Sequence, residues 1–313
     1  MSPATDEPAV VSYGTRASTT RVVRRGPHDF QWRRIPGETT VKATDLPPPP
    51  VLRLFADLSA ESTVRFAVPR ETGQRDLVYE VPDSVSIGWH MLAGAAVPKQ
   101  YADVARRVGA AVRALHERPV PAGLHRTAAW LGGLTDWLGR RPDALSDRLA
   151  RRVGAHRWAH LVRWAEEAAA GAHGIALGTL SPGVVVVDPR DLTAHVLISA
   201  EVGRGGPELD VGALAEALST SVAVARSSAH HGPENLDYAS LWEAFVSGYG
   251  PTLPDRGPVG RAALLRRVHR LRSMSSHIGE NVFLHEQIGL LPDLVEQEGA
   301  PLVPTSLIPT RRD

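Results

Sequence analysis

The chain has 313 residues, of which 43% are hydrophobic, and its 35 Lys and Arg are balanced by 34 Asp and Glu. This length predicts a globular protein with one large core or two lobes, and the formal charge of +1 points to no charged partner. Because cysteine is absent, disulfides, thiolate nucleophiles and thiolate metal sites are excluded. The sequence has no secretory signal and no apolar run of about 18 residues, so we expect a cytoplasmic protein without a membrane span.

Residues 1 to about 85 contain short β-like segments separated by Gly, Pro and polar turns, a pattern typical of a small antiparallel sheet. The segments TVRFAVP and DLVYEVP flank the turn signal RETGQR, so we expect them to form a hairpin. The prolines of LPPPP can begin a helix but cannot lie inside one. Any helix from Val51 to Ala60 is therefore predicted to be short.

Beyond Pro82, apolar residues recur at helical spacing, first along Tyr101, Val104 and Val108 and then around Trp158. Further helices are predicted at 124–139, 210–229, 238–249 and 259–273. The one β-like interruption, GVVVVDPRDLTAHVLI, predicts two short strands around a DPRD turn. The fold class is therefore α+β, with a small antiparallel β lobe followed by a mostly helical lobe.

Five stretches follow one another in the order RDLVYEVPDS, VGAAVRALHERPVP, LGTLSPGVVVVD, GGPELDVGAL and LWEAFVSGYG. They resemble, in that order, the last small-lobe strand and hinge, the Leu-His helix, the catalytic loop, the Gly-Asp-Pro-x-x-Asp-Leu segment and the Gly-Tyr helix of one family. That family comprises the aminoglycoside phosphotransferases and choline-kinase-like proteins. The resemblance covers roughly residues 40 to 285 and implies a two-lobe, protein-kinase-like fold in which Asp210 caps the helix that follows.

Four parts of the chain follow from the resemblance and the composition of its ends. They are an N-terminal arm at 1–40, a β-rich small lobe at 41–83, a helical lobe with the loop at 84–285, and a C-terminal tail at 286–313. The Pro, Gly and Arg content of the arm and the tail is typical of segments that order on contact with a partner.

The departures from the family pattern fall on the chemistry. In active members a loop Asp accepts the proton of the attacking hydroxyl, while an Asn and a later Asp hold magnesium. Thr179, Val184 and Ile198 stand at these positions here, and Leu177 replaces the loop's usual His. Valine and isoleucine offer magnesium no oxygen ligand. We therefore predict a pseudokinase that uses no cofactor. The alternative is an active phosphotransferase that uses ATP and magnesium at an atypical site.

Three more residues are candidates for that alternative. Asp188 and Glu201 could reach a metal, although we expect Asp188 to begin the DPRD turn and Glu201 to face water. Lys42, in TTVKAT, is the candidate for the lysine that pairs with phosphates, and a solvated strand residue is the other interpretation. No Gly-rich phosphate loop precedes it, and the histidines lack metal-ligand spacing, so we predict no metal site.

Arginines crowd two segments, the first strands and residues 261–272. Those of the first strands include Arg21, Arg24, Arg25, Arg33 and Arg34. Such a cluster is either a solvated face or a surface that attracts an acidic peptide or protein. Nucleic acid is not predicted, because the net charge is small and no aromatic stacking platform accompanies the arginines.

The whole pattern predicts a binding or scaffold subunit for a peptide substrate or a partner enzyme. The chain also resembles degenerate kinase-like components of systems that modify ribosomally made peptides, such as the lanthipeptide and thioamide-peptide pathways. That resemblance implies a partner that is lyase-like or another modifying enzyme.

Overall fold

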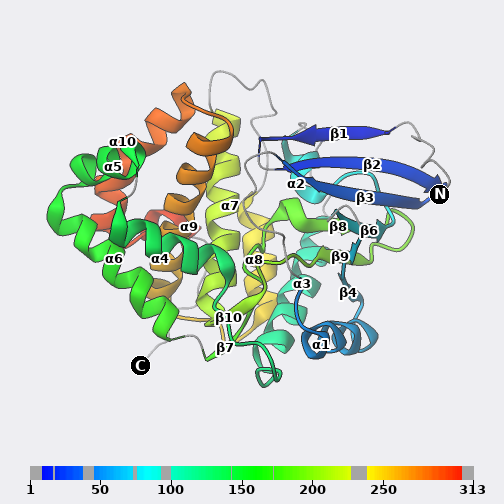
Figure 1. Ribbon diagram of the computed structural model, residues 1–313. Coiled ribbons are helices and arrows are strands. Elements are labelled where there is room, and N and C mark those ends of the chain that lie inside the picture. Colours follow the sequence, from blue (N-terminus) through cyan, green and yellow to red (C-terminus); the bar gives the residue numbers. More distant parts are fainter. Residues whose placement is uncertain are drawn as a thin grey trace.

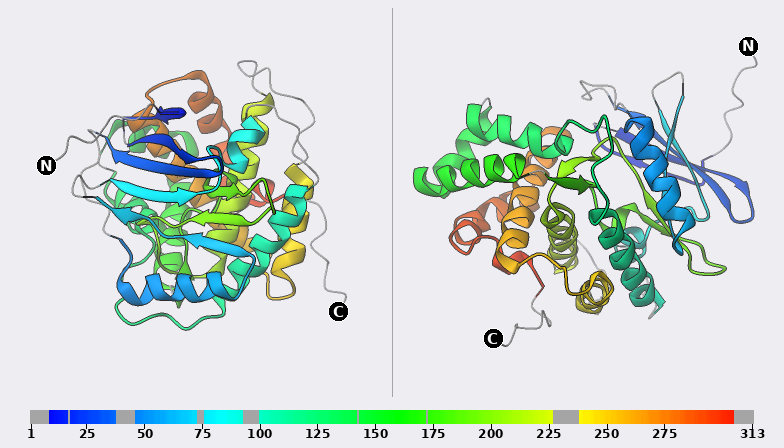
Figure 2. Two further views of the ribbon diagram at one scale, coloured as in Figure 1. Left: turned by 90° about the vertical axis from the view of Figure 1, so that its right-hand side faces the viewer. Right: turned by 90° about the horizontal axis from the view of Figure 1, so that it is seen from below.

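The computed structural model describes residues 9–16, 18–37, 46–72, 76–92, 100–141, 143–171, 173–226 and 238–304. Lys42 lies outside these residues, so its predicted role is untested. Figures 1 and 2 show a strand-rich small lobe, coloured blue to cyan, beside a helical lobe coloured green to red. The predicted α+β, two-lobe fold is confirmed.

The small lobe is a five-stranded antiparallel sheet with the order β1-β2-β3-β6-β5. Its elements are β1 (Val11–Gly14), β2 (Ser18–Gly26), β3 (Asp29–Pro36), α1 (Pro49–Ala60), β4 (Val64–Ala67), β5 (Arg70–Glu71) and β6 (Leu77–Val81). Phe30 and Trp32 alternate with polar residues along β3, so one face of the sheet is apolar and buried. The short helix α1 begins at its prolines, as predicted.

Two predictions about the small lobe are wrong. The segment TVRFAVP does not form one hairpin with DLVYEVP, because β4 pairs in parallel with a strand of the helical lobe and only the two-residue β5 pairs with β6. The boundary at residue 40 also fails, since β3 pairs with β6 and the supposed arm supplies three strands of the sheet. The alternation of apolar residues outweighs the arginine-rich composition that suggested an arm.

The helical lobe begins after the hinge residues 82–86. Its helices are α2 (Ile87–Leu92), α3 (Gln100–His116), α4 (Ala129–Arg140), α5 (Ala144–Val153), α6 (Ala155–Ala170), α7 (Pro207–Arg226), α8 (Tyr238–Tyr249), α9 (Arg256–His277) and α10 (Val282–Glu296), with the 3₁₀ turns η1 (Pro182–Val184) and η2 (Ala300–Leu302). Its strands are β7 (Gly174–Ala176), β8 (Val185–Val187), β9 (Ala194–Leu197) and β10 (Gly203–Gly205). The predicted tail therefore contains most of α10, whose apolar residues Leu284, Leu291 and Val295 are buried.

Glycine lets α3 and α8 pack at close range. A Cβ on Gly248 would lie 1.8 Å from the Arg106 carbonyl oxygen, and one on Gly109 would lie 2.2 Å from that of Phe245. Both contacts are too short for any side chain, so these positions require glycine. The close pairing fixes the C-terminal ends of both helices, His116 on α3 and Tyr249 on α8, relative to each other.

The predicted strands around the DPRD turn are β8 and β9, which pair as an antiparallel hairpin. β4 pairs in parallel with β9 and so ties the small lobe to this hairpin. A buried apolar cluster, called here the junction cluster, joins the inner face of the small-lobe sheet to the hairpin. Its members are Val22, Phe30, Trp32, Leu77, Tyr79, Val81, Val186 and Leu197.

In the part of the chain that the structure describes, no helix combines the length and apolar character needed to cross a membrane.

Candidate functional site

The loop predicted to resemble a catalytic loop connects β7 to η1 and β8. At its start Gly178 has φ +76°, a backbone region that side chains disfavour. A Cβ there would also lie 2.6 Å from the carbonyl oxygen of Glu201. The loop conformation thus depends on glycine, which is the residue that the resemblance places at this position.

Asp210 holds the loop through two backbone hydrogen bonds. Its side chain is fully buried, and it accepts the N–H of Leu177 at 2.7 Å and that of Gly178 at 2.8 Å. The same carboxylate lies 3.0 Å from His116 Nε2, and His116 Nδ1 lies 2.8 Å from the Tyr249 hydroxyl. We call His116, Asp210 and Tyr249 the loop anchor.

One tautomer satisfies all three members of the loop anchor. With the proton on Nε2, His116 donates to Asp210 and accepts the Tyr249 hydroxyl proton at Nδ1. Burial raises the pKa of Tyr249, and the negative charge of Asp210 raises it further, so the phenol keeps its proton. The anchor therefore joins α3, α7 and α8 to the loop without an exposed charge.

The loop anchor shows that the predicted role of Asp210 is wrong, and it explains what three of the sequence motifs do. Asp210 does not cap the helix that follows, because α7 already begins at Pro207 and its carboxylate points to the loop. The Leu-His, Gly-Tyr and Gly-Asp-Pro-like stretches each contribute one anchor residue. Sequence reasoning identified these stretches but did not predict that His116 and Tyr249 would meet Asp210.

The three replaced positions provide no site for magnesium. The Thr179 hydroxyl lies 3.4 Å from the Ser199 hydroxyl, and Val184 packs against the junction cluster. Ile198 is 1% exposed, and its carbonyl oxygen accepts the Tyr79 hydroxyl proton at 2.8 Å. Neither carboxylate nor amide side chains stand at these positions, so the hard-oxygen ligands that magnesium prefers are missing from them. Among the described residues, no group of three or more His, Asp or Glu could hold a metal ion.

Asp188 has the structural role that the DPRD turn predicts. It accepts the Arg190 backbone N–H at 2.9 Å and two guanidinium hydrogen bonds at 3.0 and 2.6 Å. These side-chain hydrogen bonds are the main reason that the pKa of Asp188 is lowered. The carboxylate is thus ionised and saturated by its own turn.

Glu201 does not simply face water, as we had expected. Its carboxylate accepts the Trp130 backbone N–H at 2.7 Å, in the first turn of α4. A carboxylate at a helix N-terminus satisfies a free N–H and complements the helix dipole. Both acids proposed for an atypical metal site therefore already have partners.

Comparisons with known proteins bear on the fold. No family model matches the sequence, and no curated protein matches it either. Solved structures do resemble it. Amicoumacin kinase hAmiN, in complex with AMP-PNP, Ca²⁺ and Ami, superposes with a TM-score of 0.57 and 9% identity over 95% of this chain and 90% of that one. An APH(2")-type phosphotransferase with GDP and kanamycin gives 0.55 and 13% over 95% of both chains.

A mutant of aminoglycoside 2'-phosphotransferase-IIIa in its GDP complex gives a TM-score of 0.54 and 13% identity, over 95% of this chain and 93% of that one. The chain has a phosphotransferase-like, protein-kinase-like fold. At these identities the likeness concerns the fold alone, and the loop residues decide what chemistry the fold can support.

The arginines predicted to bind a partner lie on both faces of the small-lobe sheet. Arg21 and Arg33 are cross-strand neighbours, and Arg33 pairs with buried Asp76. Arg25 donates to Gln31, and the Arg24 guanidinium lies 5.2 Å from the centre of the Phe30 ring. Arg34 is two residues beyond Trp32 along β3 and so lies on the same, inner face of the sheet. The five residues do not form one continuous patch.

In the second arginine group, on α9, Arg267 is buried and the other members are partly exposed. Arg267 and Arg270 both pair with Glu216, which is fully buried on α7. Burial alone raises the pKa of Glu216, but the two arginines outweigh it and lower the pKa to about 2. His269 is partly buried and lies against Trp130, and desolvation together with neighbouring arginines lowers its pKa to about 3. These arginines stabilise the helical lobe and are not a free surface.

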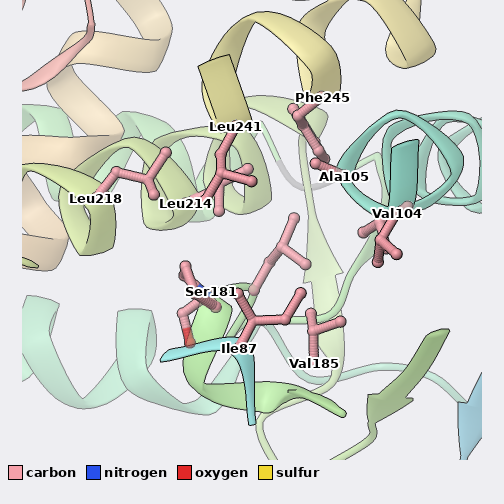
Figure 3. Close-up of a pocket in the computed structure, with 12 residues that line it drawn as sticks. Ile87, Val104, Ala105, Ser181, Val185, Leu214, Leu218, Leu241 and Phe245 are labelled. Atoms are coloured by element: carbon pink, nitrogen blue, oxygen red, sulfur yellow. The ribbon is translucent and has the colours of Figure 1, made fainter. Parts of the chain in front are cut away.

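A pocket opens beside the loop, between α2, α3, α7 and α8 (Figure 3). Its lining is almost entirely apolar and includes Ile87, Val104, Leu180, Leu214, Leu241 and Phe245, with Ser181 as the one polar side chain. A charged ligand would find one hydroxyl and no opposite charge there. The pocket suits an apolar group better than a sugar or a phosphate.

Proposed function

We propose that this phosphotransferase-like protein does not transfer phosphate and acts as a binding or scaffold subunit for a peptide or a partner enzyme. The observation that carries the proposal is the state of the loop. Its backbone is held in place by Asp210, yet valine, isoleucine and threonine occupy the positions where transfer chemistry requires an amide and carboxylates.

The packing around those positions supports the proposal. Ile198 is buried in the apolar core, Val184 is partly buried against the junction cluster, and the inner face of the small-lobe sheet contacts the β8–β9 hairpin through that cluster. A nucleotide placed between the sheet and the hairpin would have to displace these buried residues. Since each large apolar side chain contributes about 1.5–3 kcal/mol when buried, that displacement would be costly.

The kind of partner is proposed from the arginines of the first strands and from the apolar pocket beside the loop. The first strands are rich in arginine, and the pocket beside the loop is apolar, a combination that suits a peptide with acidic and apolar residues. A modifying enzyme that is lyase-like, as in the processing of ribosomally made peptides, is the partner class that the sequence resemblance suggests.

Thermal unfolding with and without ATP and magnesium tests the proposal. A ligand that binds only the folded state raises the melting temperature by mass action. We expect the same melting temperature in buffer, with ATP and magnesium, and with ATP and EDTA. An increase of several degrees that EDTA abolishes would contradict the proposal and favour an active site with an atypical metal.

A further inference from the structure

One row of residues runs across the inner face of the small-lobe sheet at the edge of the junction cluster, to which its last residue, Leu77, belongs. The strand registers place Tyr13, Thr20, Arg34 and Leu77 in line on β1, β2, β3 and β6. The neighbouring row, in contrast, consists of Val11, Val22, Trp32 and Tyr79. The sheet therefore changes from apolar to polar toward the β1–β2 turn.

Arg34 is the cation of this row, and it is partly buried. Burial raises the pKa of Tyr13, while the Arg34 charge and a side-chain hydrogen bond with Thr20 act in the opposite direction, so both groups lie near the phenol. Arg34 acts on Tyr79 in the same way. Within the described residues, no carboxylate forms an ion pair with Arg34. A partly buried cation beside two phenols favours an anion from outside.

Among the residues that the structure describes, β1 is the edge strand of the sheet. Its partner β2 uses one side of β1, and the Thr15 N–H donates to the Ser18 carbonyl at 2.9 Å at the end of the pair. In an antiparallel pair such bonds recur at every second residue, so Ser12 and Gly14 direct their N–H and C=O groups away from β2. Ser12, Tyr13 and Gly14 are exposed. An edge of this kind is a template for another strand.

Aromatic side chains lie at the same edge. Tyr13 stacks on Trp89 of α2, with ring centres 6.0 Å apart, although both are well exposed, at 40% and 45%. α2 itself is fixed against the loop, because a Cβ on Gly88 would lie 2.8 Å from the Gly183 nitrogen. The stacked pair thus links the free edge of β1 to the loop region, and it offers a surface that an apolar side chain can cover.

Charge decides which partner fits this edge. Residues 9–37 contain the single acid Asp29 against the arginines Arg16, Arg21, Arg24, Arg25, Arg33 and Arg34. These arginines are divided between the two faces of the sheet, and Arg33 pairs with Asp76, so Arg34 is the cation that an extended segment added to β1 would meet on the inner face. Its main chain would pair with β1, and alternate side chains would lie on the inner face beside Tyr13, with Thr20 and then Arg34 further along the same row.

We propose that the free edge of β1 binds an extended acidic peptide as an additional strand, with a carboxylate side chain directed toward Arg34 and an apolar side chain on the Tyr13–Trp89 pair. This inference rests on the proposed function and names the partner of the scaffold as a peptide segment. The tests are independent, since absence of phosphate transfer does not require this edge to bind anything.

The experiment measures the fluorescence anisotropy of a labelled octapeptide of alternating Glu and Val with the full chain. Controls are the same peptide with Lys in place of Glu, and one N-methylated at alternate residues to remove the backbone donors on one edge. A single-stranded oligonucleotide of equal charge is the third control. We expect the Glu-Val peptide to bind, the three controls to bind about tenfold more weakly or not at all, and added salt to weaken binding.

Variants locate the site. Ser12→Pro removes an outward N–H and leaves the β1–β2 hydrogen bonds in place, so we expect it to weaken binding about tenfold, while Ser12→Ala binds as the wild type. Arg34→Gln should weaken the Glu-Val peptide and reduce the salt dependence. Each variant's melting temperature is measured first, and if Ser12→Pro unfolds the sheet, the N-methylated peptide decides. Equal binding of the Lys and Glu peptides, binding indifferent to N-methylation, preference for the oligonucleotide, or no binding would overturn the proposal.

Discussion

Removal of the Asp210 carboxylate should disrupt the loop anchor, and the loss in the free energy of unfolding can be worked out from its hydrogen bonds. Asp210→Ala leaves the N–H groups of Leu177 and Gly178, together with His116 Nε2, without their buried acceptor. A buried unsatisfied donor costs about 1–3 kcal/mol, so the loss of these contacts should lower the free energy of unfolding by about 3–5 kcal/mol. For a chain of this length that corresponds to a melting temperature lower by roughly 5–8 °C.

Urea unfolding followed by circular dichroism measures this change, and hydrogen exchange at Leu177 and Gly178 shows whether it is located at the loop. Glu208→Ala is the matched control, two residues earlier on α7 and partly exposed, and it should change stability by less than about 0.5 kcal/mol. Asp210→Asn should fall between the two, because its amide oxygen can accept one of the two backbone N–H groups. If Asp210→Ala loses less than about 1 kcal/mol, the loop anchor does not hold the loop.

Three further predictions concern the loop and the buried charges. Introducing Asp at Thr179 and Asn at Val184 should destabilise the protein by about 1–3 kcal/mol or more and restore no phosphate transfer, measured by urea unfolding and label incorporation, whereas gain of transfer would contradict the account. The lowered pKa of His269 keeps it neutral in the fold, so its contribution is complete above the unfolded pKa of about 6.5 and is lost as pH falls toward 3. The free energy of unfolding should therefore fall between pH 7.5 and pH 5 by about 2 kcal/mol more in the wild type than in His269→Gln. His125→Gln, at an exposed histidine, should behave as the wild type. An equal fall in all three proteins would refute this prediction. The pKa of Glu216 is lowered to about 2, so its contribution to stability is complete above about pH 4.5 and is lost as pH falls through 2. Glu216→Ala should therefore lower the free energy of unfolding by about 3–5 kcal/mol at pH 7. An unchanged free energy would mean that the buried ion pairs contribute nothing.

Local periodicity predicted α3, α4, α6, α7, α8 and α9, but it did not predict α5, and most of α10 was assigned to the C-terminal tail. The range 238–249 for α8 agrees with the structure, and the strands around the DPRD turn formed as expected, because turn residues mark their ends. The β4 pairing was missed for a physical reason. TVRFAVP has the composition of a hairpin strand, but its partner β9 lies far along the chain, and composition does not encode which long-range strand is chosen.

The loop could be predicted only through its motifs. His116 is 94 residues from Asp210 and 133 residues from Tyr249 along the chain, so no local pattern predicts that they meet. Asp210 near the start of a helix suggested a cap, since that is the usual role of such a residue, whereas the fold uses it to bind the loop backbone. Arg34 was grouped with its neighbours by sequence, and the alternation along β3 separates it from Arg33.

The central claim is that this fold no longer transfers phosphate. The most direct test is an incubation with γ-labelled ATP and magnesium. The acceptor is the Glu-Val peptide with one added Ser and one added Thr. The wild type is compared with the Thr179→Ala and Glu201→Ala variants, after both variants are shown to be folded. We predict that no label enters the peptide or the protein in any of the three. Magnesium-dependent incorporation by the wild type that both variants lose would contradict the account and establish an atypical active site at the loop.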